Sequence, residues 1–296
     1  MKKILGGVIC CSFLLGMYTV LNTHQTSNIG GISVIVTPDP VFIHPDQFYS
    51  ELLFYQGVKQ VDATKFTQQP IFGGVIPHHL LASFLIADLY ARLKAQQPET
   101  IILIGPNHYE RGSFSVLTSD GSWSTAQGEV VADSTKVKDL VDHNLAAIDY
   151  GVLTLEHSVA THMAFMAHYL PQTRVIPLIL SGYLTPSEID KLVDYLAPLV
   201  SPKTVVITSI DFSHYLSERE AETNDRVTKQ AIQDHDYKLL MHLNNDYLDS
   251  PPTLVTLLKL MEKKQKSPVF IANTNSGSLL DNPSIETTSY FEIIFP

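Results

Sequence analysis

Short runs of unbroken apolar residues alternate with segments of helical periodicity along most of this chain, and this alternation limits the folds open to it. The expected strands cover residues 71–76, 100–104, 174–180, 204–209 and 289–295, and the expected helices cover 80–95, 158–170, 186–199, 221–243 and 253–264. Strands that lack polar alternation are buried on both faces, which is typical of parallel sheets covered by helices. The sequence therefore predicts one α/β domain with a mainly parallel central sheet flanked by helices.

The N-terminus carries a further apolar run, residues 4–21, directly after Lys2 and Lys3. Two lysines before an uncharged run are typical of a secretory signal or an uncleaved anchor, and a helix of this length would span roughly 27 Å. Residues 19–22 offer no small-x-small cleavage site, which favours an anchor over a cleaved signal, while a buried core helix is the third alternative. We expect a membrane-anchored or secreted protein with three segments: an anchor or signal (1–21), a stalk (22–40) and an α/β domain outside the cytoplasm (41–296).

Both cysteines, Cys10 and Cys11, lie inside the N-terminal apolar run, so the expected domain contains no thiol. Any metal site in that domain must be built from nitrogen and oxygen ligands. The net charge of −10 repels phosphate backbones, which argues against nucleic acid as a partner.

Three histidines, His78, His108 and His214, each follow the end of an expected strand by a few residues. Because the carboxyl ends of parallel strands lie at one edge of a sheet, we expect these imidazoles to converge. Histidine is the commonest metal ligand, and its second ring nitrogen needs an acceptor that fixes the tautomer. Candidate acceptors close by in sequence are Asp211, Glu156 and Asn107. For any one histidine, a loop residue that bonds a carbonyl group is the alternative.

Five short motifs that contain these residues occur in a characteristic order along the chain. They are Gly-Val-Ile-Pro-His at 74–78, Ile-Gly-Pro-Asn-His at 104–108, Trp-Ser-Thr-Ala-Gln-Gly at 123–128, Glu-His-Ser at 156–158 and Ser-Ile-Asp-Phe-Ser-His-Tyr at 209–215. In this order they resemble the Memo family, also called AmmeMemoRadiSam system protein B. The resemblance implies a fold similar to that of class III extradiol dioxygenases, which are non-haem iron enzymes.

The resemblance also implies roles for individual residues. It makes His78 and His108 metal ligands, and it matches His214 to an acid/base histidine beside the metal. We assign catalysis to His214, Asp211 and His157, and we assign the substrate pocket to His79, Asn107, Trp123 and His162. Trp123 would lie at the pocket mouth, with ordinary packing as the alternative.

The chain departs from the family pattern at three places. His79-Leu80-Leu81 stands where the family has Ala-Gly-Tyr, and Ala160 replaces a glutamate. Many Memo proteins have a cysteine as third ligand before the helix expected at 253–264, where this chain offers Asp249 instead. Two histidines and one carboxylate form the facial triad of non-haem iron enzymes, so we expect a His78/His108/Asp249 site. The alternative is that Asp249 only caps the helix that follows.

The expected function is that of a metal-dependent protein, with a non-haem oxidoreductase of a small organic molecule as the leading hypothesis. The cofactor would be a divalent transition metal, with iron ahead of zinc, copper and manganese. Two alternatives stay open: a non-catalytic protein that binds a peptide or small ligand in the same pocket, and a metal-assisted hydrolase. The motifs of serine hydrolases and Gly-rich phosphate-binding loops are absent from the sequence. The oligomeric state stays open.

Overall fold

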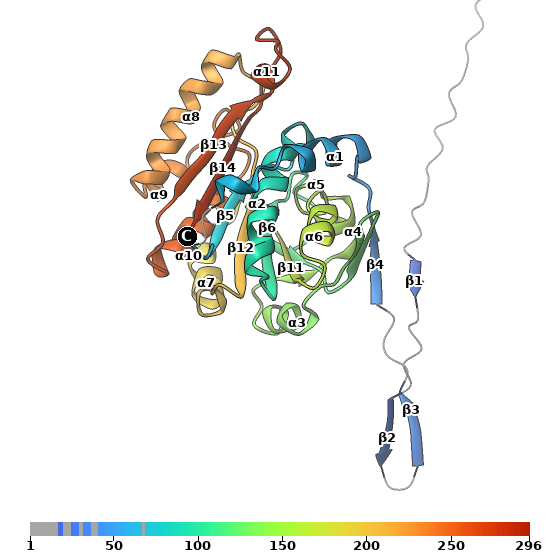
Figure 1. Ribbon diagram of the computed structural model, residues 1–296. Coiled ribbons are helices and arrows are strands. Elements are labelled where there is room, and N and C mark those ends of the chain that lie inside the picture. Colours follow the sequence, from blue (N-terminus) through green and yellow to red (C-terminus); the bar gives the residue numbers. More distant parts are fainter. Residues whose placement is uncertain (1–16, 20–24, 30–31, 37–40, 67–68) are drawn as a thin grey trace, which may run out of the picture.

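Eight strands form the central sheet in the part of the chain that this computed structural model describes, which is residues 17–19, 25–29, 32–36, 41–66 and 69–296 (Figure 1). Across the sheet the strands follow in the order β10 (Ala147–Ile148), β7 (Val116–Thr118), β11 (Arg174–Leu180), β6 (Thr100–Pro106), β12 (Thr204–Ser209), β5 (Gly73–Ile76), β14 (Ser289–Phe295) and β13 (Val269–Asn275). The four inner strands β11, β6, β12 and β5 are parallel. Strand β7 runs antiparallel to β11 but parallel to β10, while β14 runs antiparallel to both β5 and β13. The expected α/β sheet is confirmed, with antiparallel strands added toward its edges.

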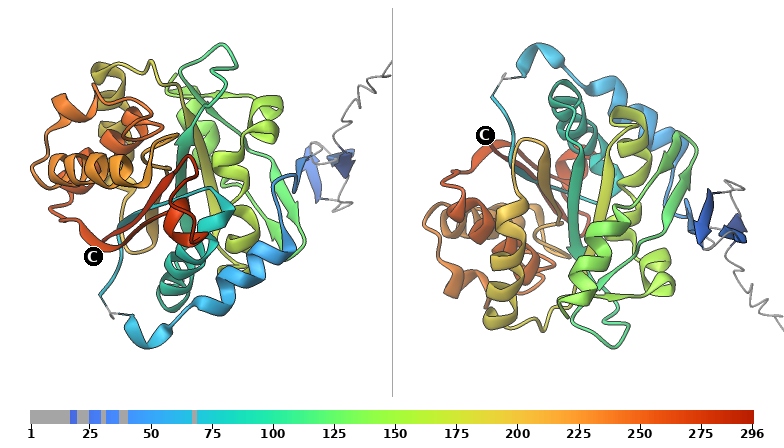
Figure 2. Two further views of the ribbon diagram at one scale, coloured as in Figure 1. Left: turned by 90° about the horizontal axis from the view of Figure 1, so that it is seen from above. Right: turned by 90° about the horizontal axis from the view of Figure 1, so that it is seen from below.

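Helices cover both faces of this sheet (Figure 2). One face carries α3 (Ser134–Asp142), α7 (Pro186–Leu196), α8 (Glu218–Gln233), α9 (Tyr237–Leu240) and α10 (Pro251–Lys263). The other face carries α1 (Glu51–Gln60), α2 (Ser83–Gln96), α4 (Tyr150–Leu155), α5 (His157–Ala160) and α6 (Met163–Tyr169). Short α11 (Ser276–Leu279) follows β13, and single 3₁₀ turns lie at η1 (Ala63–Lys65), η2 (Leu80–Ala82) and η3 (Ala197–Leu199).

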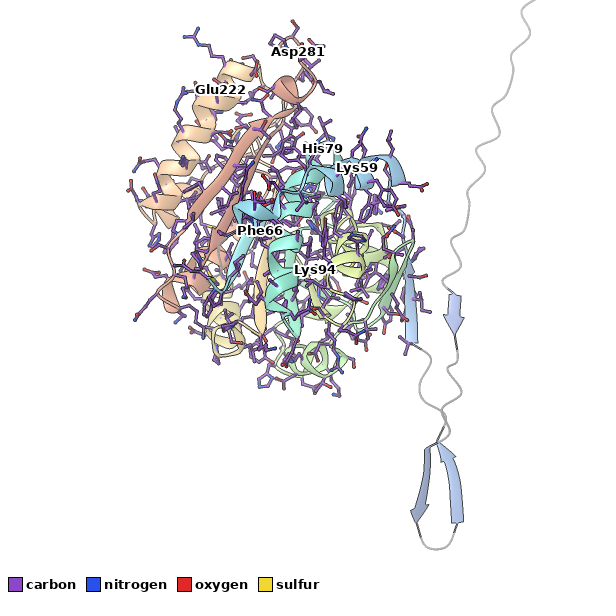
Figure 3. The ribbon with its side chains drawn as sticks, in the orientation of Figure 1. Lys59, Phe66, His79, Lys94, Glu222 and Asp281 are labelled. Atoms are coloured by element: carbon purple, nitrogen blue, oxygen red, sulfur yellow. The ribbon has the colours of Figure 1, made fainter. Side chains whose placement is uncertain are left out.

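Alternate residues of the inner strands supply two separate apolar cores. In β6, Ile102 and Ile104 pack under α7 and α10, while Ile101 and Leu103 pack under α2 and α6. All four side chains are fully buried, which explains why this strand reads as an unbroken apolar run. The outer faces of the helices carry charged side chains such as Lys59, Lys94 and Glu222 (Figure 3).

A smaller sheet lies beside α4 and α6 and orders its strands as β1 (Met17–Thr19), β4 (Val41–Pro45), β8 (Ser122–Thr125) and β9 (Gly128–Val130). Strands β2 (Gln25–Ile29) and β3 (Ile32–Val36) form an antiparallel pair. The proposed division at residues 21 and 40 stays a prediction.

The expected membrane-anchored or secreted location is wrong. Within the described residues, no helix is both long enough and apolar enough to cross a bilayer. Residues 17–19 of the apolar run form strand β1, which pairs antiparallel with β4 instead of continuing a helix. The rest of that run, including Cys10 and Cys11, lies outside the described residues.

Candidate metal centre

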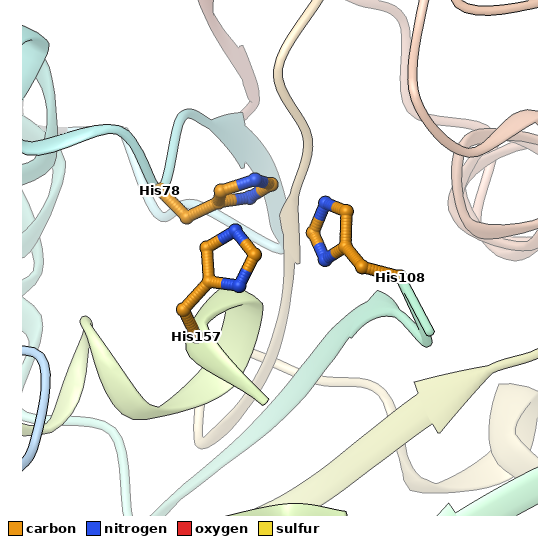
Figure 4. Close-up of side chains that lie close together, drawn as sticks. All are labelled: His78, His108 and His157. Carbon is orange, nitrogen blue, oxygen red and sulfur yellow. The ribbon is translucent and has the colours of Figure 1, made fainter. Parts of the chain in front are cut away.

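Three imidazoles meet at the carboxyl edge of the parallel strands (Figure 4). His78 follows β5, His108 follows β6, and His157 is the first residue of α5. One ring nitrogen from each lies within 4.8 Å of the others. The ring centroids of His78 and His108 are 4.9 Å apart, and His157 stacks on His108 at 4.2 Å. The structure thus brings together the two histidines predicted as ligands and adds a third, which the sequence analysis placed among the catalytic residues.

Close packing at Gly105 allows His157 to reach this position. A Cβ atom on Gly105 would lie 2.5 Å from Oγ of Ser158, so a larger residue in β6 would push α5 away. The Ser158 hydroxyl instead donates to the carbonyl oxygen of Pro106 at 2.9 Å. Helix α5 is therefore fixed to the end of the strand that leads to His108.

Glu156 orients two of the three imidazoles. Its Oε1 lies 2.8 Å from Nδ1 of His108 and 3.3 Å from Nδ1 of His157, while Oε2 accepts the backbone N–H of His108 at 2.9 Å. The Nδ1 atoms are thereby occupied, and the Nε2 atoms are left for the centre of the cluster. This arrangement of carboxylate behind imidazole is common around metal sites in proteins.

Asp249 brings a carboxylate to the same place. Its Oδ2 lies 3.4 Å from Nε2 of His78 and 3.7 Å from Nε2 of His108, and the side chain is 4% exposed. Its Oδ1 is buried without a hydrogen-bond partner among the described residues. The alternative that Asp249 caps α10 is wrong, because the side chain of Ser250 accepts from Thr253 N in that position.

Asp211 contacts both the backbone and the ring of His78. Its Oδ1 accepts the backbone N–H of His78 at 3.1 Å, and its Oδ2 lies 3.4 Å from Nε2 of the same residue. Burial, together with the negative charge of Asp249, raises the pKa of Asp211 well above its usual range. The backbone N–H of Asp211 in turn donates to Oδ2 of Asp249 at 3.0 Å, which links the two carboxylates.

The electrostatic environment differs between the histidines. Burial lowers the pKa of His78 well below its ordinary value, and the neighbouring imidazoles add to this. Burial also acts to lower the pKa of His108, but the hydrogen bonds and charges of Asp249 and Glu156 outweigh it and raise that pKa to about 10. The negative charge that holds a proton on His108 would equally favour a metal cation.

Behind His78, two buried side chains form a second layer. Nδ1 of His78 lies 3.0 Å from Oγ of Ser209, and the same hydroxyl lies 2.9 Å from Nε2 of His162. Both Ser209 and His162 are fully buried. The assignment of His162 to the substrate pocket is corrected, because its side chain is fully buried and does not line the cavity beside His78.

A cavity of about 420 Å³ opens beside His78 and His157, and its lining is Phe48, His78, His79, Leu80, Tyr109, His157, Thr161 and Asp211. His79, predicted for the substrate pocket, lies in this lining, and its Nδ1 lies 2.6 Å from the hydroxyl of Tyr290. His214 lies near enough for its charge to interact with His79, His108 and Asp249, but it is outside the group of three. Burial lowers the pKa of His214, although the Asp249 charge opposes this.

Two other predicted pocket residues lie elsewhere. Trp123 is fully buried in strand β8 and stacks on His44 at 4.2 Å, so its expected place at the pocket mouth is wrong and core packing holds. Asn107 does not line the cavity either: its amide donates to the carbonyl oxygen of Arg111 at 2.7 Å and closes the loop after His108.

Four residues at the site have no role predicted from the sequence, namely Phe48, Tyr109, Ser209 and Tyr290. Ser209 offered a signal, since it is a polar residue at the end of an apolar strand and begins the motif that contains Asp211. Tyr290 and Phe48 offered none, because they reach the site from segments far away in sequence.

Comparison with known proteins shows which family has this arrangement of motifs. The family model described as Memo-like protein matches residues 61–291. This chain belongs to the Memo family. The resemblance seen in the motifs is thereby confirmed, and the α/β fold agrees with it.

Several Memo relatives are similar over most of their length. A MEMO1 family protein of Metallosphaera sedula is 26% identical and covers 75% of this chain and 81% of its own length. A MEMO1 family protein of Sulfurisphaera tokodaii is 25% identical, covering 80% of this chain and 87% of the relative. Among solved structures, uncharacterized protein JW3007 from Escherichia coli K12 matches with a TM-score of 0.47 and 12% identity, over 74% of this chain and 98% of that chain.

The residues of this Memo protein fit a metal ion. Three imidazoles present nitrogen atoms to one point, two of them with their Nδ1 atoms held by Glu156, and a buried carboxylate oxygen of Asp249 has no partner among the described residues. The three-histidine cluster could therefore bind a metal ion.

Proposed function

We propose that this protein is a metal-dependent enzyme in which His78, His108 and His157 hold a divalent transition metal beside Asp249. The observation that carries the proposal is the approach of three imidazole nitrogens to within 4.8 Å, with the second nitrogens of His78 and His108 hydrogen-bonded away from the centre. Imidazoles held in this way have their Nε2 atoms directed toward a single point before any ion arrives.

The donor set supports iron ahead of zinc and manganese. Nitrogen and carboxylate ligands suit these ions, whereas Cu(I) prefers sulfur, and neither the three-histidine cluster nor the cavity lining includes a cysteine or methionine. When bound, such an ion supplies Lewis acidity and, in the case of iron, redox chemistry. We therefore place the protein among non-haem oxidoreductases.

The side chains around the cavity would bind and orient the second reactant. A volume of about 420 Å³ suits a small organic molecule. Phe48 and Leu80 would pack against its apolar part and exclude water, while His79 and Thr161 offer polar contacts. His214, whose Nδ1 is buried without a partner among the described residues, would hold or release a proton beside the reacting atoms.

Metal analysis tests the proposal. The full chain is loaded anaerobically with Fe(II) and, separately, with Zn(II), and bound metal is measured by mass spectrometry after desalting. We expect about one ion per chain for the wild type and a loss of ten-fold or more in affinity for His78→Ala, His108→Ala and His157→Ala. His143→Ala serves as control, because His143 is exposed and bonds its own helix through Asp139.

If all three variants keep the metal affinity of the wild type, the proposed metal centre is wrong. Metal binding without turnover of any oxidisable small molecule would point instead to a ligand-binding protein. Turnover with zinc as well as with iron would favour metal-assisted hydrolysis.

A further inference from the structure

A hydrogen-bonded chain runs from the candidate metal centre into the core. It begins at His78, passes through the hydroxyl of Ser209 and ends at His162, with heavy-atom distances of 3.0 Å and 2.9 Å. The far end, Nδ1 of His162, is buried and has no hydrogen-bond partner among the described residues. Such a chain has a direction, because the hydroxyl has a single proton to donate.

When each imidazole is neutral, two arrangements satisfy both bonds and also give the buried Ser209 hydroxyl proton an acceptor. In the first, Nε2–H of His162 donates to Ser209, and Ser209 donates to Nδ1 of His78. The proton of His78 then resides on Nε2, which lies 3.4 Å from the nearest carboxylate oxygens of both Asp211 and Asp249.

In the second arrangement every bond is reversed. Nδ1–H of His78 donates to Ser209, Ser209 donates to Nε2 of His162, and the proton of His162 resides on Nδ1. Of the two, this arrangement leaves a lone pair on Nε2 of His78, and a metal ion needs that lone pair.

We infer that Ser209 and His162 are positioning residues for the metal centre, and that His162 changes tautomer when an ion binds Nε2 of His78. This inference rests on the proposed function, because it requires His78 to be a ligand. One proton leaves Nε2 of His78 to water. The Ser209 proton passes to Nδ1 of His78, the Nε2 proton of His162 passes to Ser209, and one proton enters from water at Nδ1 of His162. The three groups together keep the same number of protons.

The consequence is a link between metal affinity and a residue that touches neither metal nor cavity. Without an ion, the first arrangement is favoured because Nε2–H of His78 faces two carboxylates. With an ion, the second arrangement is imposed, and the buried Nδ1 of His162 becomes a donor. Removing the hydroxyl of Ser209 releases His78 from His162 and removes the bond that orients its ring.

Nitrogen NMR of the full chain, labelled with ¹⁵N-histidine, tests the tautomer change directly. The probe is Zn(II) alone, which is diamagnetic and binds imidazole nitrogen. Signals of His162 are identified by their loss in His162→Gln. We expect Nε2 of His162 to bear the proton in the metal-free protein and Nδ1 to bear it after zinc is added, a change that a purely structural role would not produce.

Zinc affinity gives a second, independent readout. We expect Ser209→Ala to weaken zinc binding by about 10- to 100-fold, and Ser209→Thr, which keeps the hydroxyl, to restore most of it. Thermal unfolding of each variant checks that it is folded.

The outcomes separate the two proposals. If the wild type binds no zinc, the metal centre itself is wrong and this inference falls with it. If the wild type binds zinc while the protonated nitrogen of His162 stays the same, or if Ser209→Ala binds as tightly as the wild type, only the tautomer relay is overturned.

Discussion

Contacts with three other residues hold the side chain of Asp249 at the candidate metal centre. Its Oδ2 accepts the backbone N–H of Asp211 and faces the Nε2 atoms of His78 and His108. Many Memo proteins have a cysteine in this segment, where this chain has Asp249. A buried carboxylate in its place shifts the preference of the site from soft to harder ions.

We expect Asp249→Ala to lower metal affinity as severely as His108→Ala, because the change removes both an oxygen ligand and the negative charge nearest the two imidazoles. Asp249→Asn keeps the shape and separates these effects. Metal content and a zinc titration measure the outcome, and Asp246→Asn, at an exposed position three residues earlier, is the control. Full metal occupancy in Asp249→Ala would leave the three histidines as the complete ligand set.

At the residue scale, the sequence predicts the parts of the site that depend on strand ends. His78 and His108 follow apolar runs, and the lack of a thiol in residues 41–296 directs attention to Asp249. The partnership of Ser209 with both His78 and His162 depends on strand register, since Ser209 lies opposite Ile76 across the β12–β5 pair. That register comes from tertiary packing, which a single sequence does not reveal.

At the scale of elements, the junction between β6 and α5 determines where two of the histidines lie. Gly105 gives α5 room to approach, and the Ser158 hydroxyl bonds the carbonyl oxygen of Pro106. His108 leaves the strand and His157 begins the helix on either side of this contact.

Gly105→Ala should therefore damage stability and metal binding together. The added methyl would meet Ser158, and overpacking of this kind costs about 1–3 kcal/mol. The displaced α5 would carry His157 away from the other ligands. Urea unfolding and zinc titration measure the two effects, with Gly151→Ala in α4 as control, where the new methyl meets only ordinary contacts. That control should be neutral or stabilising by up to about 1 kcal/mol.

Element boundaries show where helical periodicity fails as a guide. The helix expected at 158–170 is divided into α5 and α6, and the one expected at 221–243 is divided into α8 and α9. In the second case His235 has a φ of 55°, and Asp236 caps the new helix by accepting from Leu239 N. The apolar pattern continues across the break because both pieces pack on one core, so periodicity alone cannot detect the interruption.

Helix α3 and the short strands β7 to β10 are not predicted from the sequence, since their runs are too brief or too polar.

At the scale of the whole molecule, the small sheet is joined to the main body around His44. Its ring is fully buried, stacks on Trp123, and bonds the hydroxyls of Ser119 and Thr154 at 2.7 Å each. Burial lowers the pKa of His44 from 6.5 to about 4. A neutral imidazole is thus built into the interface between two sheets.

Because the folded protein holds His44 neutral, its free energy of unfolding should decrease as the pH is lowered. Between about pH 6.5 and pH 4 the unfolded chain binds a proton at His44 that the folded chain does not, so the contribution is present above pH 6.5 and is lost as the pH falls. The full loss is about 3 kcal/mol near pH 4. Urea unfolding followed by Trp123 fluorescence should show a smaller pH dependence in His44→Gln than in the wild type, and exposed His242→Gln should match the wild type. Equal slopes in all three proteins would exclude His44 as the cause.

The carboxylate of Glu156 has a consequence for the thermodynamics of assembly. It joins the loop after β6 to the first turn of α5 by contacting two imidazoles and two backbone N–H groups. The conformational entropy of bringing two chain segments together is therefore lost when the protein folds, before any ion arrives. An incoming ion would meet these donors already positioned, so part of the affinity of the proposed centre would come from the entropy that Glu156 has already removed.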